Sequence, residues 1–528
     1  MQLQDAADET VSLLPAKPQS GTLREGQALQ LYSNEAFALF AQYAGVGLVA
    51  STLPSAITPF FTYYLNMEGT ATTSARALVE VVWAFKVFMG VLLDCVPIGG
   101  YRRRPYMLIG WIITATCLFA MACIPIGEPY FPDPELRYIR PDNYTPQQEA
   151  SLNKGAPSTG GVYIVLMMMA SFGYVLVDVA SDGLFVEYAQ REPIATRGHI
   201  QSAVSSVRAF FQVVAQLITG FGLSSPPYGG DFDFGISFPN TMLILALFCL
   251  PVIPMAWFFI HEKQVEAPQF KQYLDSLWLT IQRRAVYQVL AYSFFSGVFL
   301  SFTYVANDPM TSYWVRASSF SLSISGIVGG GVVVVTIALT GMYGLNWSWH
   351  TIQVATTLST IAVDAVCTMS VTWDVIRAPW FWVGLPIAEA VPGAVTSLLT
   401  SLVVVELVGQ GNEAAVFGLM TTVPNLGMPV GFALTKIVNA PFRVHNDDIL
   451  NDTYEVRRDV TITILISYVM SLSSLLFLPL LPRQRAETQE LRKNGGSSSV
   501  MGAITIAYLV VALSMAVFTN LHSIFESE

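Results

Sequence analysis

Long apolar segments recur along almost the whole chain and are separated by short polar loops. Twelve of these segments approach or exceed the roughly 20 residues that a membrane-spanning helix needs. They cover residues 36–65, 73–97, 105–125, 160–189, 200–223, 239–260, 286–306, 320–344, 350–372, 379–406, 414–439 and 460–481. A thirteenth apolar segment, 499–521, follows a soluble Gly/Ser stretch. The pattern predicts an all-α polytopic membrane protein with a twelve-helix core in two six-helix halves and one extra C-terminal span.

The composition agrees with a membrane protein. Of the 528 residues, 53% are hydrophobic and 12% are charged, which is too apolar for an ordinary soluble domain. The net charge of −10 is spread over loops and tails, without the basic patch that nucleic acid requires. We therefore expect a lipid bilayer as a partner and no nucleic acid. The histidines are scattered singly and no catalytic motif occurs at a credible place, so we expect neither an enzyme nor a cofactor.

The cysteines all fall inside apolar segments, where small buried hydrophobic residues are the simplest interpretation. We therefore predict no disulfide and no metal site. These residues are Cys95, Cys117, Cys123, Cys249 and Cys367.

The loop between the second and third segments carries Arg102, Arg103 and Arg104, which places it in the cytoplasm by the positive-inside bias. This loop orients the rest of the chain. The predicted organisation is a cytoplasmic polar tail (1–34), an N-terminal half (35–260), a central cytoplasmic linker (261–285), a C-terminal half (286–482), a soluble connector (483–498), the extra helix (499–521) and a short tail (522–528).

Two sequons, at Asn143 and Asn451, lie in the predicted outer loops and suit N-glycosylation in a eukaryotic host. Pro146 directly follows the first sequon and weakens it. The chain is expected to be a multi-pass protein of the plasma membrane or of an endolysosomal or vacuolar membrane.

Ionisable residues inside the apolar segments are costly in hydrocarbon and are functional-site candidates for that reason. Lys86, Asp182 and Arg208 each lie eight to ten residues from a predicted cytoplasmic boundary and share a depth. Asp178 lies one helical turn from Asp182, on the same face. An acid here either forms a buried ion pair with Arg208 that locks two helices together, or it exchanges between a basic partner and a proton.

Each ionisable residue in these segments has more than one interpretation. Lys86 and Arg208 are also suited to hold a carboxylate of the substrate. Asp364 and Glu389 are lone acids in the second half, with a role either in hydrogen bonding to a neighbouring helix or in a cavity. Glu187 lies nearer the cytoplasmic loop, where the arginine cluster or Arg197 is a possible partner.

Three places in the sequence resemble the folate–biopterin transporter family of the major facilitator superfamily, over roughly residues 36–482. They are Asp94 with the stretch Tyr101-Arg102-Arg103-Arg104-Pro105-Tyr106, the stretch Asp178-Val-Ala-Ser-Asp182 with Glu187, and the run from Glu192-Pro193 through Arg197-Gly198 and Gln201 to Arg208. The resemblance implies transport of folates or pteridines by alternating access, with protons as the coupling ion. It also implies a latch that holds the two halves together, made of Gly90, Asp94, Arg102, Arg103, Arg104, Glu187 and Arg197.

The arginine-rich loop also resembles that of the sucrose and glycoside–cation symporters, so a sugar symporter is the alternative. A channel or receptor is the alternative of another class. The substrate site is expected to be lined by Lys86, Asp178, Asp182, Arg208, Asp364 and Glu389.

Overall fold

The computed structural model describes residues 22–67, 69–138, 144–230, 232–316, 319–409 and 411–525. Within these ranges the chain is almost entirely helical, and its β-structure is limited to two isolated bridges, Ile98 with Tyr101 and Arg283 with Ser497. The predicted all-α class is therefore confirmed.

The first part of the chain forms long helices joined by short turns. They are α2 (Asn34–Ile57) with a π-helical extension (Thr58–Tyr64), α3 (Gly69–Glu80), a 3₁₀ turn (Val81–Phe85), α4 (Lys86–Cys95), α5 (Arg104–Cys123), α6 (Pro146–Ser151), α7 (Gly160–Arg191), α8 (His199–Gly222) and α9 (Phe238–Phe258).

The remainder begins with the amphipathic helix α10 (Phe270–Gln282) of the linker. It is followed by α11 (Arg284–Leu300), α12 (Asn307–Pro309), α13 (Ser319–Leu339), α14 (Trp349–Thr372), α15 (Pro379–Leu407), α16 (Glu413–Asn439), α17 (Asn446–Asn451), α18 (Tyr454–Ser473), α19 (Arg485–Asn494) and α20 (Ser499–Phe525).

Ten of the described helices are long and apolar enough to cross a membrane. The other predicted spans also coincide with helices but differ in detail. The second is divided into α3, a 3₁₀ turn and α4, and it carries Glu80, Lys86 and Asp94. The seventh, α11, has 17 residues. The count of twelve spans plus one therefore stays a prediction, as does the division into halves.

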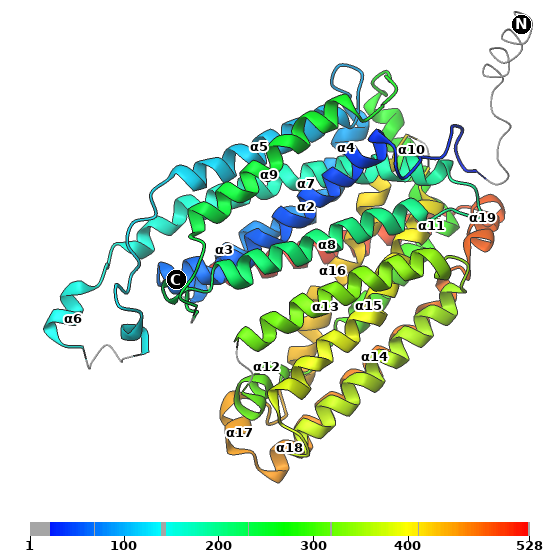
Figure 1. Cartoon of the computed structure of the whole chain (residues 1–528). Helices are drawn as coiled ribbons and strands as arrows, with labels where there is room; N and C mark the ends of the chain where they lie inside the picture. Colours follow the sequence, from blue (N-terminus) through cyan, green and yellow to red (C-terminus); the bar gives the residue numbers. More distant parts are fainter. Residues whose placement is uncertain are drawn as a thin grey trace, which may run out of the picture.

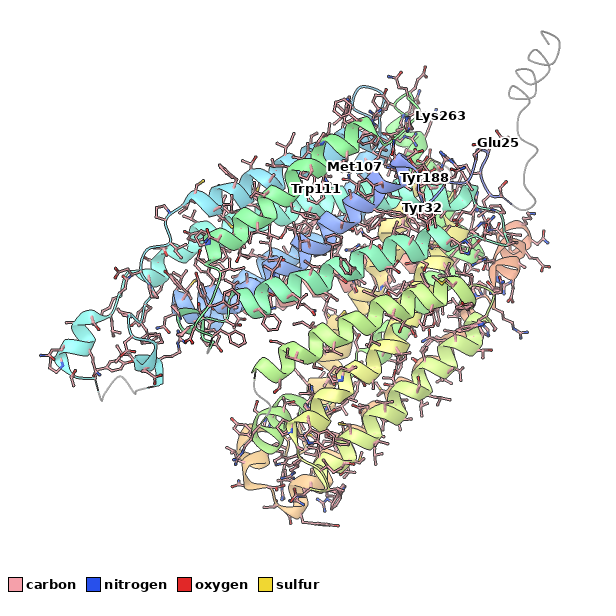
Figure 2. All side chains as sticks on the ribbon, in the orientation of Figure 1. Glu25, Tyr32, Met107, Trp111, Tyr188 and Lys263 are labelled. Atoms are coloured by element: carbon pink, nitrogen blue, oxygen red, sulfur yellow. The ribbon has the colours of Figure 1, made fainter. Side chains whose placement is uncertain are left out.

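The helices form two groups that converge at one end of the molecule, where α4, α10 and α19 lie, and diverge toward α6 and α17 (Figure 1). The convergent end carries Arg102 to Arg104 and is called the arginine-loop end below. Glu25, Tyr188 and Lys263 lie there as well (Figure 2).

Close approach between helices depends on small residues, as is usual in membranes. A Cβ atom at Gly110 of α5 would lie 2.5 Å from the carbonyl oxygen of Gly173 in α7. Between the two groups, a Cβ atom at Gly90 of α4 would lie 2.7 Å from the carbonyl oxygen of Ala414 in α16. The backbones of α4 and α16 therefore touch at the arginine-loop end.

Gly90→Ala tests this backbone contact. Because the added methyl group meets backbone atoms that cannot rotate away, α4 and α16 must separate, at a cost of about 1–3 kcal/mol. We expect a lower Tm in detergent and slower transport. Gly161→Ala in α7 is the matched control, since its Cβ atom meets open space. Equal Tm values for the two variants would contradict the close contact.

Candidate substrate and coupling site

Four charged side chains from three helices meet in the interior. Lys86 Nζ lies 2.7 Å from Asp178 Oδ2 and 2.6 Å from Asp182 Oδ2. Arg208 Nη1 lies 2.8 Å from Asp178 Oδ1. The shared face of Asp178 and Asp182 on α7 thus bridges the lysine of α4 and the arginine of α8. We call these four residues the charge tetrad.

The charge tetrad is deeply buried and formally neutral. Asp178 is fully buried, Lys86 is 6% exposed and Asp182 is 4% exposed. Buried charges are tolerated when each has a partner, but removing one partner leaves an uncompensated charge. The side chain of Arg208 is 26% exposed, which makes it the most accessible member of the tetrad.

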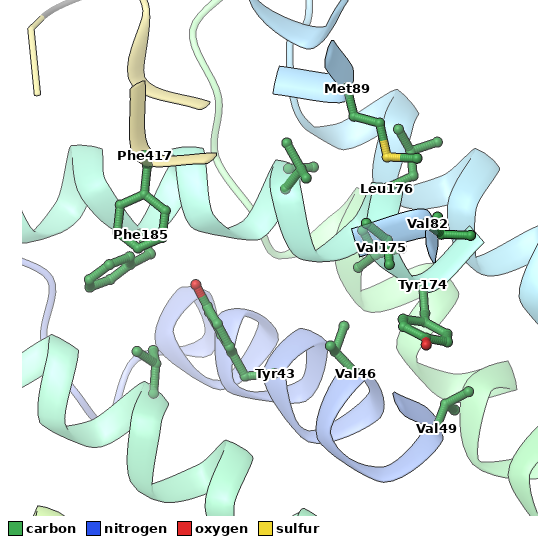
Figure 3. Close-up of a cluster of buried hydrophobic side chains, with 14 of the residues drawn as sticks. Tyr43, Val46, Val49, Val82, Met89, Tyr174, Val175, Leu176, Phe185 and Phe417 are labelled. Atoms are coloured by element: carbon green, nitrogen blue, oxygen red, sulfur yellow. The ribbon is translucent and has the colours of Figure 1, made fainter. Parts of the chain in front are cut away.

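Aromatic side chains surround the charge tetrad. The Tyr43 hydroxyl of α2 donates to Asp182 Oδ1 at 2.8 Å. The Trp83 ring centre lies 5.6 Å from Lys86 Nζ and 5.7 Å from Arg208 Cζ. Tyr43, Phe185 and Phe417 lie close together, with Phe417 reaching over from α16 (Figure 3). The sequence did not predict the contact of Tyr43 with Asp182, because Tyr43 is uncharged and is one of several polar side chains in α2.

A cavity of about 220 Å³ lies against this cluster and is lined by both groups of helices. One wall is charged and aromatic, and contains Lys86, Asp182 and Arg208. Opposite hydroxyl and amide groups come mainly from α15 and α16: Ser401, Thr421, Thr422 and Asn425. We call this the central cavity. It offers cations, a proton-accepting acid, flat rings and neutral hydrogen-bonding groups in one place.

Asp364 and Glu389 lie in a second cavity of about 440 Å³, formed by α14, α15, α18 and the segment from Phe302 to Thr311. The Tyr468 hydroxyl donates to Asp364 Oδ2 at 2.5 Å. Trp382 is part of the same wall. The second cavity shares no lining residue with the central cavity. The structure therefore brings together four of the six predicted site residues and places the other two apart from them.

A buried ion-pair network closes the arginine-loop end. Arg103 Nη2 lies 2.8 Å from Asp94 Oδ1 and 3.5 Å from Glu413 Oε2, and all three side chains are at most 1% exposed. Asp94 Oδ2 also accepts the backbone N–H of Ala415 at 3.0 Å. This network joins α4 and the arginine loop to α16, as a latch would.

A second buried pair joins the same two groups of helices. Arg197 Nη1 lies 2.8 Å from Glu406 Oε1, and both side chains are 1% exposed. The Gln190 amide donates to the carbonyl oxygens of Val405 and Val408 at 3.2 and 2.9 Å. The end of α7 is therefore tied directly to the end of α15.

The other predicted latch residues have different surroundings. Glu187 lies 3.1 Å from Arg24 and 4.0 Å from Arg191, rather than in an ion pair with the arginine cluster or with Arg197. Arg104 stacks on Trp257, with its Cζ 4.6 Å from the ring centre. The backbone N–H groups of Arg102, Arg103 and Arg104 all donate to the Glu262 carboxylate.

Three acids of this region, Glu262, Glu406 and Glu413, were not among the predicted site residues. Each lies near the end of a helix or in the linker, where the sequence alone does not distinguish a buried acid from a solvated one. Glu406 had a partial signal, because the end of the tenth apolar segment parallels the end of the fourth at Glu187.

Glu192 caps the turn between α7 and α8. Its carboxylate accepts the backbone N–H groups of Gly198 and Ile200 at 2.8 and 3.1 Å. Burial raises the pKa of the Glu192 carboxyl to about 7. Because the folded state then holds this proton more tightly than the unfolded state, the contribution to stability is full below the usual pKa of 4.5 and is lost as pH rises through 7.

We expect Tm of the wild-type protein to fall by a few degrees between pH 5 and pH 8 because of Glu192. Glu192→Gln removes this titration, so its Tm should change less over the same range, whatever its absolute value. Thermal unfolding in detergent at stepped pH measures the two slopes. Parallel slopes would contradict the assignment.

Only one of the two predicted glycosylation sites lies within the described residues. Asn451 is exposed at the end of α17. The next residue, Asp452, pairs with Arg377 and Arg457 at 2.7 and 2.8 Å, which fixes the turn into α18. Asn143 lies outside the described residues.

The fold is that of membrane transporters of the major facilitator superfamily. Among solved structures, the proton:xylose symporter XylE has a TM-score of 0.56 at 12% identity, covering 87% of this chain and 98% of that chain. The transporter FucP in its outward conformation has a TM-score of 0.50 at 13% identity, covering 84% of this chain and 98% of that chain. At this identity the likeness concerns the fold.

The sequence comparisons show what the chain is similar to. Residues 46–131 match the BT1 family. A folate-biopterin transporter of Synechocystis sp. is 24% identical over 441 residues, which are 81% of this chain and 78% of that protein. A probable folate-biopterin transporter of Arabidopsis thaliana is 22% identical over 161 residues, 30% of this chain and 27% of that protein. The chain is thus similar to folate–biopterin transporters, and this confirms the resemblance seen in the sequence. It is a transporter and not an enzyme.

Proposed function

We propose that the protein carries folate- or pteridine-type solutes across its membrane by alternating access, coupled to protons. The observation that carries this proposal is the central cavity, where a buried and neutral charge tetrad faces both groups of helices. The names of the two relatives support the substrate class.

The chemistry of the central cavity suits such a solute. The glutamate carboxylates of a folate match Arg208, which is the most exposed cation of the tetrad. The flat pteridine ring matches the aromatic faces of Trp83 and Phe417. Hydroxyl and amide groups such as Thr421 and Asn425 match the polar edge of the ring.

Proton coupling is assigned to Asp182. Its carboxylate is shared by Lys86 and by the Tyr43 hydroxyl, and its neighbour Asp178 already neutralises Arg208. When a substrate carboxylate binds Arg208, it replaces Asp178 as the partner of Arg208. Asp178 then pairs with Lys86 alone. Because Asp178 now neutralises the charge of Lys86, the negative charge of Asp182 is no longer stabilised by Lys86 alone. Asp182 can therefore take up a proton. A proton and an anionic substrate are thus held together.

Alternating access needs a closed and an open form of the latch. With Arg103 on Asp94 and Glu413, the arginine-loop end is shut and the central cavity faces the other side. Breaking this network and the Arg197–Glu406 pair lets the two groups rock about the central cavity. We also propose that Asp364 and Glu389 form a second acidic site within the C-terminal group. Asn451 is proposed as a glycan acceptor on the opposite side.

Counterflow in proteoliposomes tests the substrate without any imposed gradient. Vesicles loaded with unlabelled folate should take up labelled folate or biopterin, and empty vesicles should not. Sucrose serves as the competitor for the alternative class, since hydroxyl and amide groups also line the central cavity. Counterflow of sucrose alone would replace the folate proposal with that of a sugar symporter.

A further inference from the structure

Two joined cavities at the arginine-loop end lie outside the central cavity, and one of them borders the Arg197–Glu406 pair. One, of about 290 Å³, lies beneath α10 and the end of α15. The other, of about 760 Å³, lies beside α19. They share three lining residues, Leu23, Arg283 and Arg492, and therefore form one continuous hollow. We call it the basic hollow.

The backbone holds the walls of the basic hollow in place. Arg283 of the linker forms an antiparallel bridge with Ser497 of the connector. Arg284 N donates to Gly496 O at 3.1 Å, and Ser498 N donates to Gln282 O at 3.0 Å. The polar tail closes a third side, because Leu23 N donates to Gln190 O at 3.0 Å. Tail, linker and connector thus meet around one space.

Positive charge in the basic hollow is not balanced by carboxylates. Arg197, Arg283, Arg492 and Lys493 line it, and no acid does so among the described residues. Of these, Arg197 is paired with Glu406. Arg492 donates to the backbone oxygen of Glu406 at 3.3 Å, while the Glu406 carboxylate is engaged by Arg197 and Gln489. Burial and the neighbouring charge of Arg283 lower the pKa of Arg492. The guanidinium group of the half-buried Arg492 is therefore repelled by that of the exposed Arg283.

The contrast with the neighbouring hollow shows that this imbalance is local. A cavity of about 940 Å³ around the arginine loop has basic residues too, but four carboxylates line it. They are Glu25, Glu35, Glu187 and Glu262. The basic hollow has no such compensation, so it lacks a negative charge that a ligand would supply.

A further group points to a ligand in the basic hollow. Asn412 lines it and is 2% exposed. Its amide nitrogen donates to the Thr280 hydroxyl at 3.2 Å, and its amide oxygen has no hydrogen-bond partner in the structure. A buried acceptor without a partner is unfavourable, so a hydroxyl of a ligand would be bound there.

We propose that the basic hollow binds a phosphate-type anion from the cytoplasm or from a lipid headgroup, held by Arg283, Arg492 and Lys493 with Asn412 accepting a ligand hydroxyl. Guanidinium groups match phosphate in bidentate geometry, which favours phosphate over a simple halide. Because the ligand would join the tail, the linker and the connector, it would stabilise the closed arginine-loop end. This proposal does not depend on which solute the central cavity carries.

Thermal unfolding of the full-length protein in nanodiscs tests the site. In phosphatidylcholine nanodiscs, inorganic phosphate should raise Tm with a saturating dependence on concentration, and KCl of equal ionic strength should not. The same protein in nanodiscs containing phosphatidylinositol 4-phosphate forms the second arm. A response to free phosphate identifies a soluble ligand, and a response only to the lipid identifies a headgroup. No response in either arm, or an equal response to KCl, overturns the proposal.

Variants distinguish specific binding in the basic hollow from a non-specific effect of positive surface charge. Arg283→Gln with Arg492→Gln should abolish the response, and without ligand it should not lower Tm, because two repelling charges are removed. Arg284→Gln is the matched control, since Arg284 is exposed like Arg283 and adjacent to it in sequence, but does not line the basic hollow. It should respond like the wild type. A full response in the double variant would overturn the proposal.

Discussion

Asp182→Asn should abolish accumulation of folate or biopterin against a concentration gradient, while counterflow of the same solute persists. The asparagine keeps the size of the side chain and can still accept from Tyr43 and Lys86, but it cannot bind and release a proton. Without titration at this position, the proton gradient has no means of driving the solute. We expect at least a tenfold loss of gradient-driven accumulation.

The measurement is uptake into proteoliposomes with and without an imposed pH gradient, for equal amounts of reconstituted protein. Asp374→Asn is the matched control, because that side chain is 54% exposed and lies outside both cavities. Asp364→Asn separately tests the second cavity: full accumulation by this variant would remove Asp364 from coupling. Full concentrative uptake by Asp182→Asn would remove Asp182 from that role.

Arg103→Gln should open the arginine-loop end. The substitution leaves the buried Asp94 without its cation, while Glu413 keeps Arg24 at 2.8 Å, and the loss costs the closed form about 3–5 kcal/mol. A change of this size shifts the ratio of closed to open molecules by about 100-fold or more. We expect slow transport, with the open form now dominant.

A native cysteine reports this opening. Cys95 is 7% exposed and packs with Tyr273 and Ala415 at the latch. In a Cys123→Ser background, which removes the exposed thiol, Cys95 should react with a maleimide at least tenfold faster in Arg103→Gln than in wild type. Cys249 and Cys367 should stay unreactive in both proteins, which shows that the helix groups remain folded.

Arg102→Gln is the matched control for the latch. The side chain of Arg102 makes no ion pair in the described structure and donates one 3.5 Å hydrogen bond to the Gly411 carbonyl. Its maleimide reactivity at Cys95 should equal that of wild type. If Arg103→Gln and Arg102→Gln behaved alike, the loop would orient the protein in the membrane without acting as a gate.

The charge tetrad was predictable because two of its residues share one face of a single helix and the others lie at the same depth in the membrane. Asp178 and Asp182 lie four residues apart, so they share a face whatever the helix packs against. The depths of Lys86 and Arg208 follow from their distances to polar loops. An ion pair in hydrocarbon then needs partners at equal depth, and the sequence offered only these.

The latch partners were not predictable in the same way. Arg103 and Glu413 are far apart in the chain, and their contact depends on how α4 meets α16 at Gly90. The three arginines look equivalent in the sequence, yet one is fully buried and the other two are not. For the same reason Asp364 and Glu389 were expected at the central cavity, because depth does not tell which side of a helix faces which cavity.

The most direct test of the account is uptake of labelled folate and of labelled biopterin by the wild-type protein in proteoliposomes, with a pH gradient imposed across the membrane. The account predicts accumulation of at least one of them above the external concentration, and loss of that accumulation when the gradient is dissipated. Equilibration without accumulation would contradict proton coupling. No entry of either solute, with sucrose accumulated in their place, would contradict the assignment of the substrate.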